Sequence, residues 1–140
     1  MVDKTLILRK IAELSEYLDQ TQEFQDISIQ AYTSDWKTQR IVERTLQMMI
    51  EVCADMASHI ISDAAYRVPK TYADAFRVLH ENAILNEGLS AKMERMAKFR
   101  NIVVHQYDDI DAEIVVGILK KHLADFSDFK EAILGFLREN

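Results

Sequence analysis

Apolar residues recur every three to four positions along most of this chain, and this spacing is what most constrains its fold. The pattern is strongest between Trp36 and about Ser62, where apolar and polar side chains fall on opposite faces of a helix. The apolar face holds Val42, Leu46, Met49, Val52, Cys53, Met56 and Ile60, and the polar face holds Arg40, Arg44, Gln47, Glu51 and Ser58. With only three Gly and one Pro, few of the turn formers that β-rich folds need are present. The sequence therefore predicts an all-α fold.

The same spacing continues on both sides of this segment and predicts one antiparallel bundle of about five helices. The expected helices span about 2–24, 36–62, 72–82, 90–106 and 108–137, with a short helix or a loop over 25–35. Thr71 and Ser90 are the expected N-caps of the third and fourth helices, Asn86 to Gly88 is the expected turn between them, and a bend is expected near Ser127. No repeat or linker interrupts the chain, so we expect residues 1–140 to form a single domain.

Composition excludes some classes of protein. A single Cys rules out an intramolecular disulfide and a zinc site built from cysteines. The formal net charge of −6 argues against a protein that coats nucleic acid or anionic membrane through bulk positive charge. The N-terminus lacks the features of a signal peptide, and no apolar run approaches the ~18–20 residues that a membrane span requires. We therefore expect a cytoplasmic protein with no membrane partner.

Arg100 occupies an unusual position for a charged residue. On a helical wheel it lies at the centre of an apolar stripe, within about 60° of Met93, Met96, Ala97, Val103, Val104 and Tyr107. An unpaired guanidinium is costly to bury, so Arg100 must pair with an anion or face a cleft or a second chain. Phe99 and Ile102 lie on the far side, which indicates a helix that is covered on more than one face.

His105 and Asn101 lie four residues apart, so their side chains can meet on one edge of the helix. His105 is about 140° from Arg100 on a regular helix, and the two converge only near a helix end or across a subunit boundary. An imidazole that titrates near neutrality can take the proton of a ribose 2′-hydroxyl. A guanidinium can hold the phosphate and stabilise its developing charge. Together the two groups suit phosphodiester cleavage without a metal.

The pattern Arg100-Asn101-x-x-x-His105-x-Tyr107 resembles the Arg-x4-His-x-Tyr motif of the HepT-like toxins, a branch of the HEPN superfamily. The resemblance covers about Trp36 to Phe129. It is carried by three segments of the sequence, which are Trp36–Leu46 with the following Ile50-Glu51-Val52, Val68–Phe76, and Phe99–Asp111.

This resemblance implies an all-α HEPN bundle that forms a homodimer, with the motif in a cleft between the protomers. It implies a metal-independent endoribonuclease without a cofactor, acting on RNA as the toxin of a type VII toxin–antitoxin pair. A MntA-like nucleotidyltransferase would be the antitoxin and would adenylylate Tyr107. By position, Arg100 would bind the phosphate, His105 would be the acid–base residue, and Asn101 would support the site. Bulk and negative charge on Tyr107 would block the cleft and compete for Arg100.

Structural roles remain open for the same residues. Arg100 could be a core arginine paired with Glu51 or Asp108, the His105 ring could be satisfied by backbone carbonyls, and Tyr107 could be an interface aromatic. Two other functions also remain open. One is a non-catalytic HEPN module that binds a nucleotide or a nucleotidyltransferase partner. The other is a purely structural helical dimer, which requires Arg100 and His105 to be satisfied internally.

The remaining charged and polar residues have simpler interpretations. His59, His80 and His122 have no second ligand at a convincing metal spacing, and the acidic residues of 108–113 suit a helix N-terminus. Net acidity opposes RNA binding. We expect local cations to offset it, namely Lys92, Arg95 and Lys98 beside the motif and Arg40 and Arg44 on the polar face of the second helix.

Overall fold

The chain folds into helices throughout. The structure, a computed structural model, describes residues 2–140, and within this range it contains no strand. The α-helices are α1 Lys4–Gln22, α2 Ile29–Thr33, α3 Trp36–Asp63, α4 Tyr72–Glu81, α5 Glu87–His105, α6 Ala112–Lys121 and α7 Leu123–Glu139, and the 3-10 turn η1 Tyr107–Asp109 lies between α5 and α6. The prediction of an all-α fold is confirmed. No helix of the described range is long and apolar enough to cross a membrane.

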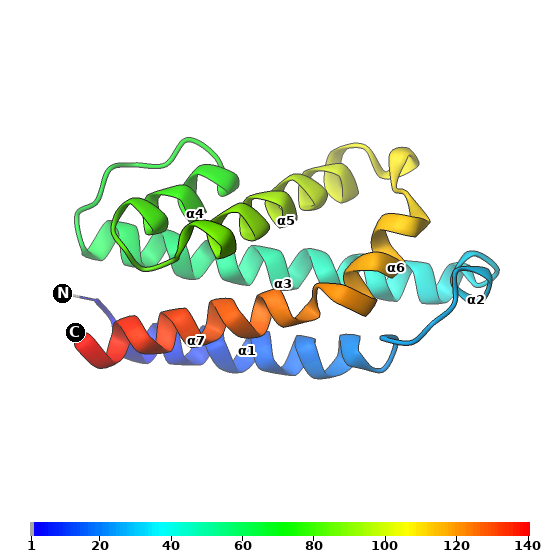
Figure 1. Cartoon of the computed structure of the whole chain (residues 1–140), viewed down its shortest axis with the longest axis horizontal. Coiled ribbons are helices and arrows are strands. Elements are labelled where there is room, and N and C mark those ends of the chain that lie inside the picture. Colours follow the sequence, from blue (N-terminus) through cyan, green and yellow to red (C-terminus); the bar gives the residue numbers. More distant parts are fainter. Residues whose placement is uncertain (1) are drawn as a thin grey trace.

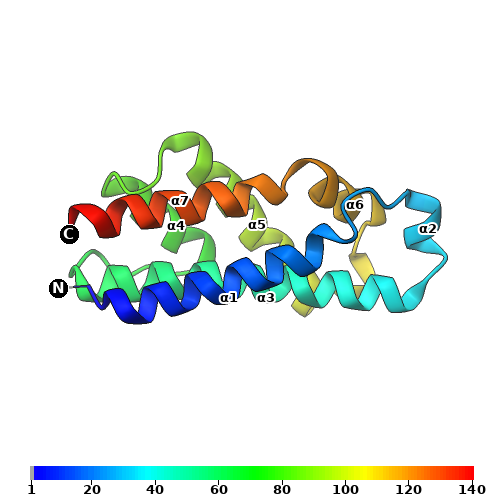
Figure 2. The ribbon, with the colours of Figure 1, turned by 90° about the horizontal axis from the view of Figure 1, so that it is seen from below.

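The long helix α3 lies at the centre of the arrangement and contacts α1, α2, α4 and α5. Figure 1 shows α1, α3 and α7 running along the long axis, with α4 and α5 lying over α3. Seen from below in Figure 2, α1 and α7 extend side by side, and the two termini lie at the same end of the molecule. The short helix α2 closes the opposite end.

Burial of the predicted apolar face of α3 forms the core. All seven of its residues from Val42 to Ile60 are buried, as the helical spacing predicts. Phe76 of α4 meets Phe129 of α7 edge to face, with ring centroids 5.6 Å apart and an interplanar angle of 86°, an arrangement that aromatic pairs prefer. This contact joins the layer that carries α4 and α5 to the helices beneath it.

The number of helices is larger than the expected five, for two local reasons. Residues 29–33 form α2, which Ser28 caps by accepting from the backbone N–H of Ala31 at 3.1 Å. The expected final helix is two helices, α6 and α7, and it breaks at His122 rather than bending near Ser127. The His122 ring nitrogen Nδ1 lies 3.2 Å from the carboxylate of the buried Asp125 in the first turn of α7, which holds the break in place.

The expected N-cap of α5 is also wrong. Asn86 caps this helix, because its side chain accepts from the backbone N–H of Leu89 at 2.8 Å. Ser90 is instead buried inside the helix and donates to the carbonyl of Phe76 at 3.4 Å. Residues 86–88, the expected turn, are therefore the N-cap and first residues of α5. At α4 the prediction is confirmed, since Thr71 accepts from the backbone N–H of Asp74.

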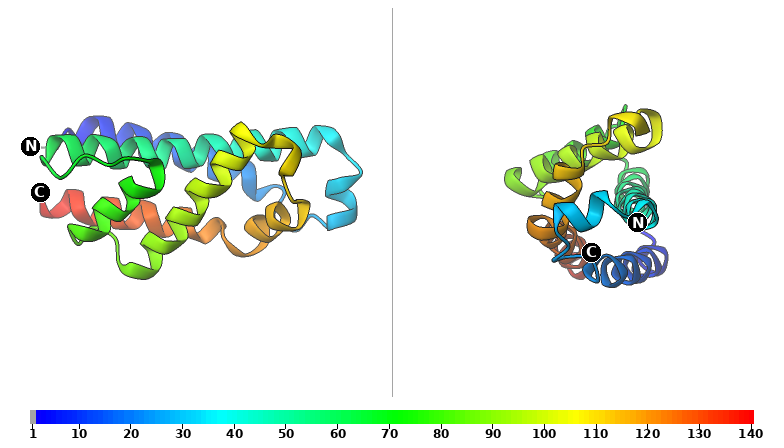
Figure 3. Two further views of the ribbon diagram at one scale, coloured as in Figure 1. Left: turned by 90° about the horizontal axis from the view of Figure 1, so that it is seen from above. Right: turned by 90° about the vertical axis from the view of Figure 1, so that its right-hand side faces the viewer.

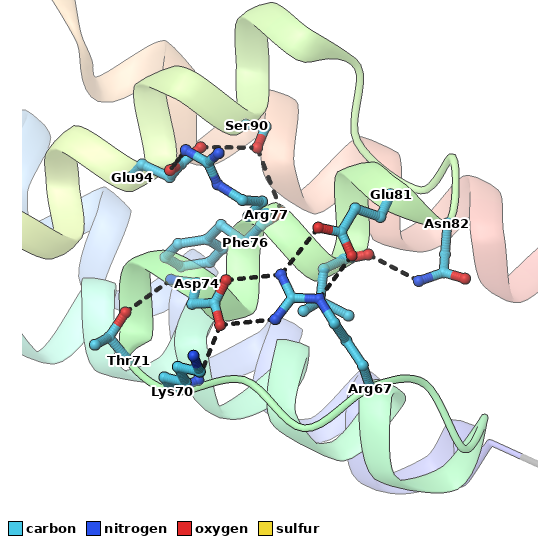
Figure 4. Close-up of polar contacts among 11 residues, drawn as sticks. Arg67, Lys70, Thr71, Asp74, Phe76, Arg77, Glu81, Asn82, Ser90 and Glu94 are labelled. Carbon is cyan, nitrogen blue, oxygen red and sulfur yellow. Dashed lines mark hydrogen bonds and ion pairs between the residues drawn. The ribbon is translucent and has the colours of Figure 1, made fainter.

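The connector between α3 and α4 is held to the bundle by Arg67 (Figure 4). Its guanidinium donates to both oxygens of Asp74 at 2.8 and 2.9 Å and to both oxygens of Glu81 at 2.8 and 2.9 Å. The backbone N–H of Lys70 also donates to Asp74. The hydrogen bonds from Arg67 are the main reason that the pKa of Asp74 falls from its ordinary 3.8 to about 2.

The Arg67 network predicts a pH-dependent effect of Arg67→Met on stability. A carboxyl with a depressed pKa adds stability above its unfolded pKa of 3.8, and this stability is lost as pH falls towards about 2. We expect Arg67→Met to melt below the wild type at pH 7, and the difference to disappear between pH 4 and 2. Circular dichroism melts measure it. Lys120→Met, at an exposed lysine with no ion pair within residues 2–140, is the control, and an equal pH dependence there would contradict the assignment.

Two alanines adopt the left-handed backbone conformation that glycine favours. Ala65 follows α3 with φ of 59°, and Ala83 follows α4 with φ of 62°. At each position the next residue donates its backbone N–H back to the helix, Tyr66 to Ile61 and Ile84 to Leu79, which is the Schellman ending. In a chain with three Gly, alanine fills these positions at some cost in strain.

Relieving this strain should stabilise the protein. We expect Ala65→Gly and Ala83→Gly each to raise the free energy of unfolding by about 0.5–1 kcal/mol, because glycine has no Cβ to oppose a positive φ. Urea denaturation measures the change. Ala12→Gly, on the exposed face of α1, is the matched control and should lower stability by about 1 kcal/mol. Destabilisation at all three positions would show that the two alanines are unstrained.

Candidate active site

The motif lies where α5 leaves the core. Figure 3 shows α5 crossing obliquely over α3, with its C-terminal end beyond the crossing. Buried residues of α5 end at Phe99, and no residue from Asn101 to Asp109 is buried. Ile102, Val103 and Val104 are half-buried although they are apolar. The helix is covered along its first part, and its last turn presents apolar side chains that the chain itself only partly covers.

Arg100 is held by a carboxylate of α3. Its Nε and Nη2 donate to the same oxygen of Glu51, Oε2, at 2.9 and 2.7 Å. Gln47 also donates to that oxygen at 3.1 Å. Of the two carboxylates that the sequence offers as partners, Glu51 is therefore the one used, and Asp108 is not. The Arg100 side chain is 17% exposed and that of Glu51 is 29% exposed, so the pair lies at the edge of the core.

Two further groups fix the plane of the guanidinium. Nη1 of Arg100 donates to the side-chain oxygen of Asn101 at 3.3 Å, and Cζ lies 4.7 Å from the ring centroid of Tyr72, within the range of a cation–π contact. A guanidinium has five N–H donors, and these contacts use three of them. Two N–H groups, one on each terminal nitrogen, remain available to an anion.

His105 is the last residue of α5 and is exposed. Within residues 2–140 its ring makes no hydrogen bond or ion pair, and neither Asn101 nor Arg100 contacts it through one. The expected meeting of Asn101 and His105 is therefore not seen, because Asn101 turns to Arg100. A purely structural role requires both Arg100 and His105 to be satisfied internally, and only Arg100 meets that requirement.

Tyr107 opens the 3-10 turn η1 and is 70% exposed. No hydrogen bond to its hydroxyl occurs in the described part of the chain. The residue before it, Gln106, is the C-cap of α5. The phenol is therefore accessible from solvent in this chain.

Only some of the expected cations are free to bind an anion. Lys92 lies 3.8 Å from Asp125, and Arg40 lies 3.3 Å from Glu43. Three others, which are Arg44, Arg95 and Lys98, form no ion pair with any residue of the range 2–140, and all three are exposed. The basic surface near the motif has fewer free cations than the sequence predicts, because ion pairs neutralise two of the five expected residues.

The other histidines have structural partners, as does Asp111 among the acidic residues of 108–113. His80 Nδ1 lies 2.9 Å from the carbonyl of Leu85, and His59 lies 3.8 Å from Asp55. Asp111 caps α6 by accepting from the backbone N–H of Glu113, as expected for a helix N-terminus. Across residues 2–140, no three His, Cys, Asp or Glu side chains are grouped so as to hold a metal ion.

Sequence reasoning missed the Tyr72 contact and did not decide between Glu51 and Asp108. One signal for Glu51 is present, since Gln47 and Glu51 lie four residues apart on the polar face of α3. No local pattern identifies Tyr72, which reaches Arg100 only because α4 packs against α5 and α3.

The Glu51 contact predicts a loss of stability when the carboxylate is removed. We expect Glu51→Ala to lower the free energy of unfolding by about 1 kcal/mol, because a guanidinium that is mostly out of water loses its partner. Glu51→Gln keeps an acceptor oxygen and should cost less. Urea denaturation measures both. Arg44→Ala, at an exposed arginine of α3 with no ion pair within residues 2–140, is the control, with a change below about 0.5 kcal/mol. Equal losses for Glu51→Ala and Arg44→Ala would contradict the assignment.

Comparison with known proteins assigns the chain to a family. The family described as "Ribonuclease HepT-like" matches residues 14–133. Over 128 residues the chain is 31% identical to "mRNA nuclease HepT" of Shewanella oneidensis, covering 91% of this chain and 96% of that protein. It is 29% identical over 136 residues to "tRNA nuclease HepT" of Aphanizomenon flos-aquae, covering 97% and 92%.

A solved structure has the same fold. It is described as tri-AMPylated Shewanella oneidensis HEPN toxin in complex with MNT antitoxin, and it superposes with a TM-score of 0.86 at 30% identity, covering 96% of this chain and 99% of that one. The motif of α5 thus lies on a HEPN fold. On these matches, the chain belongs to the HepT-like ribonuclease family.

Proposed function

We propose that this chain is an RNA endonuclease that acts as the toxin of a toxin–antitoxin pair. The observation that carries the proposal is the placement of Arg100, His105 and Tyr107 at the uncovered end of α5 in a member of the HepT-like ribonuclease family. The related proteins named as an mRNA nuclease and a tRNA nuclease support RNA as the substrate class.

The chemistry needs no metal ion. The His105 imidazole takes the proton of a ribose 2′-hydroxyl, and the 2′-oxygen forms a bond to phosphorus while the bond from phosphorus to the 5′-oxygen breaks. The products are a 2′,3′-cyclic phosphate and a 5′-hydroxyl, whose proton comes from an imidazolium. Arg100 holds the phosphate through its two remaining N–H groups and stabilises the charge of the transition state. Asn101 and Glu51 position the guanidinium.

The site is completed by a second copy of the chain. Arg100 and His105 face different directions on α5, and the half-buried Ile102, Val103 and Val104 lie between them on the last turn of the helix. Apolar residues in such a position are typical of a surface that a partner covers. In a homodimer, the His105 of one protomer takes the proton and its counterpart donates one.

Local charge offsets the acidic body. Arg44 on α3 and Arg95 and Lys98 on α5 are exposed cations near the motif that form no ion pair in the described range. Each can neutralise one phosphate, and the dimer doubles the set. RNA binding therefore depends on salt concentration, although the chain carries a formal charge of −6.

The antitoxin inhibits the toxin by modifying Tyr107. The solved relative is a HEPN toxin that is AMPylated and bound to an MNT antitoxin. By analogy, a MntA-like nucleotidyltransferase joins the Tyr107 oxygen to the α-phosphorus of ATP, and pyrophosphate leaves. The exposed phenol is accessible to that enzyme. The added AMP places bulk and negative charge beside His105 and blocks the approach of RNA.

Cleavage should persist without divalent metal and depend on His105. We expect the purified chain to cut a mixed RNA pool in EDTA, and His105→Ala to lose at least 100-fold in rate, on the order expected when an acid–base group is removed. Gel analysis with 2′,3′-cyclic phosphate detection measures it. His59→Ala, at a histidine outside the motif, is the matched control.

Two results would contradict this proposal. One is cleavage that EDTA abolishes and magnesium restores, which would contradict the metal-free mechanism. The other is absence of cleavage by a chain whose intact mass shows no AMP, together with tight binding of a nucleotidyltransferase. The second result would support the non-catalytic module in place of the enzyme.

Modification should depend on the hydroxyl of Tyr107. We expect Tyr107→Phe to cut RNA at a rate close to that of the wild type, and to resist neutralisation by a MntA-like enzyme with ATP, because the acceptor oxygen is missing. Intact-mass spectrometry and RNA cleavage measure the two properties. Tyr66→Phe keeps Tyr107 and is the control. AMP found on the Tyr107→Phe chain, with neutralisation intact, would move the modification to another residue.

A further inference from the structure

A pocket opens beside Arg100, at the meeting of α1, α3, α4 and α5. Its volume is about 480 Å³, inside the range of ~300–1,000 Å³ that is typical of small-ligand sites. The polar part of its lining consists of Tyr17, Glu51, Asp55, Ser58, Tyr72 and Arg100. None of the roles assigned above uses this space, although Arg100 forms one of its walls.

The wall of the pocket at Arg100 combines a guanidinium with an aromatic ring. The Arg100 guanidinium lies over the Tyr72 ring at 4.7 Å, and both groups line the pocket. Unpaired RNA bases bind by stacking on aromatic rings and on arginine planes. A second aromatic side chain, Tyr17 of α1, lines the same space.

Two of the hydrogen-bonding groups of the pocket are carboxylates, Glu51 and Asp55. Glu51 uses Oε2 for Arg100 and Gln47, and its Oε1 has no hydrogen bond within residues 2–140. Asp55 pairs through Oδ2 with Lys10 at 2.6 Å, and its Oδ1 lies 3.8 Å from His59. Carboxylates accept hydrogen bonds and cannot donate them. A base that fits must therefore present N–H groups to them.

Guanine matches this requirement best among the four bases. Its Watson–Crick edge presents two adjacent donors, the N1–H and the exocyclic N2 amino group, which suit a carboxylate. Uracil presents one N–H between two carbonyl oxygens, and those oxygens would face the carboxylates of the pocket. The free carboxylate oxygens of Glu51 and Asp55 cannot donate to the oxygens of a phosphate, so the base and the phosphate are separated, with the phosphate on the Arg100 side.

We infer that this pocket binds an unpaired guanine of the RNA, next to the phosphate that is cut. The inference rests on the proposed nuclease function and gives it a sequence preference. Tyr72 stacks on the base, and Glu51 Oε1 and Asp55 accept hydrogen bonds from its N–H edge. Arg100 lies between the base and the phosphate that it binds. Tyr72 and Glu51 therefore act in substrate selection as well as in positioning Arg100.

The first test is a map of cut sites in a random-sequence RNA pool, made with the full-length wild-type chain. We expect guanine to exceed uracil about tenfold at one fixed position beside the cut, the discrimination of about 1.4 kcal/mol that a charged hydrogen bond supplies. Ser58→Trp fills the pocket and should remove the preference. Ser58→Ala leaves the pocket open and should keep it. Ala12→Trp adds the same side chain on the exposed face of α1 and should also keep it.

The second test measures binding without cleavage. Guanosine 3′-monophosphate and uridine 3′-monophosphate are titrated into the wild type and Ser58→Trp, with chemical shifts of the tyrosine rings as the readout. The pocket is supported if guanosine binds about tenfold more tightly than uridine and if folded Ser58→Trp loses this difference. Circular dichroism and thermal melts establish that this variant is folded.

The outcomes separate the pocket from the nuclease. Cleavage by the wild type with no base preference overturns the pocket and leaves the nuclease standing. Guanosine binding that Ser58→Trp removes, without any RNA cleavage, overturns the nuclease and with it the assignment of the guanine to RNA, and it marks a site for a free nucleotide. Shifts of the pocket tyrosines on dimer formation, with neither nucleotide bound, overturn the proposal and assign the space to a second copy of the chain.

Discussion

Burial of one face of α3 is the constraint on which the rest of the structure depends. This helix has 28 residues, and its apolar side packs into the core while four other helices contact it. Its position leaves a polar face that the bundle covers only in part. Gln47 and Glu51 lie on that face, so the helix that organises the core also places the carboxylate that holds Arg100. Core packing and active-site geometry are therefore set by the same element.

The two proposed catalytic groups are held in different ways, for a physical reason. A guanidinium at the edge of the core needs a counter-charge, because removing it from water unpaired is costly. Glu51 supplies that charge and still leaves two N–H groups of Arg100 for a phosphate. An imidazole that exchanges protons with a substrate must remain accessible, and His105 lies at the exposed end of α5. Arg100 is thus fixed within the chain, whereas His105 meets its partners only when substrate and a second copy are present.

Local patterns predicted most of the fold and missed features that depend on packing. Helical spacing placed α1, α3 and α4 to within about two residues, and Thr71 was identified as a cap. The prediction of Ser90 as a cap is wrong, because Asn86, four residues earlier, caps the helix and the Ser90 hydroxyl is buried against α4. The break between α6 and α7 was missed because its stabilising contact, from His122 to Asp125, gives no periodic signal. A single domain over residues 1–140 stays a prediction from the sequence.

The sequence by itself determined the all-α class, the buried face of α3 and the candidate residues Arg100, Asn101, His105 and Tyr107, because helical periodicity and a short motif depend only on neighbouring residues. The tertiary structure decided that Glu51, 49 positions away, and not Asp108 pairs with Arg100, and that the guanidinium lies over the Tyr72 ring. It also decided which cations stay free, since ion pairs neutralise Lys92 and Arg40. Contacts between distant segments depend on how the helices pack, whereas helical spacing determines only which face of each helix is apolar.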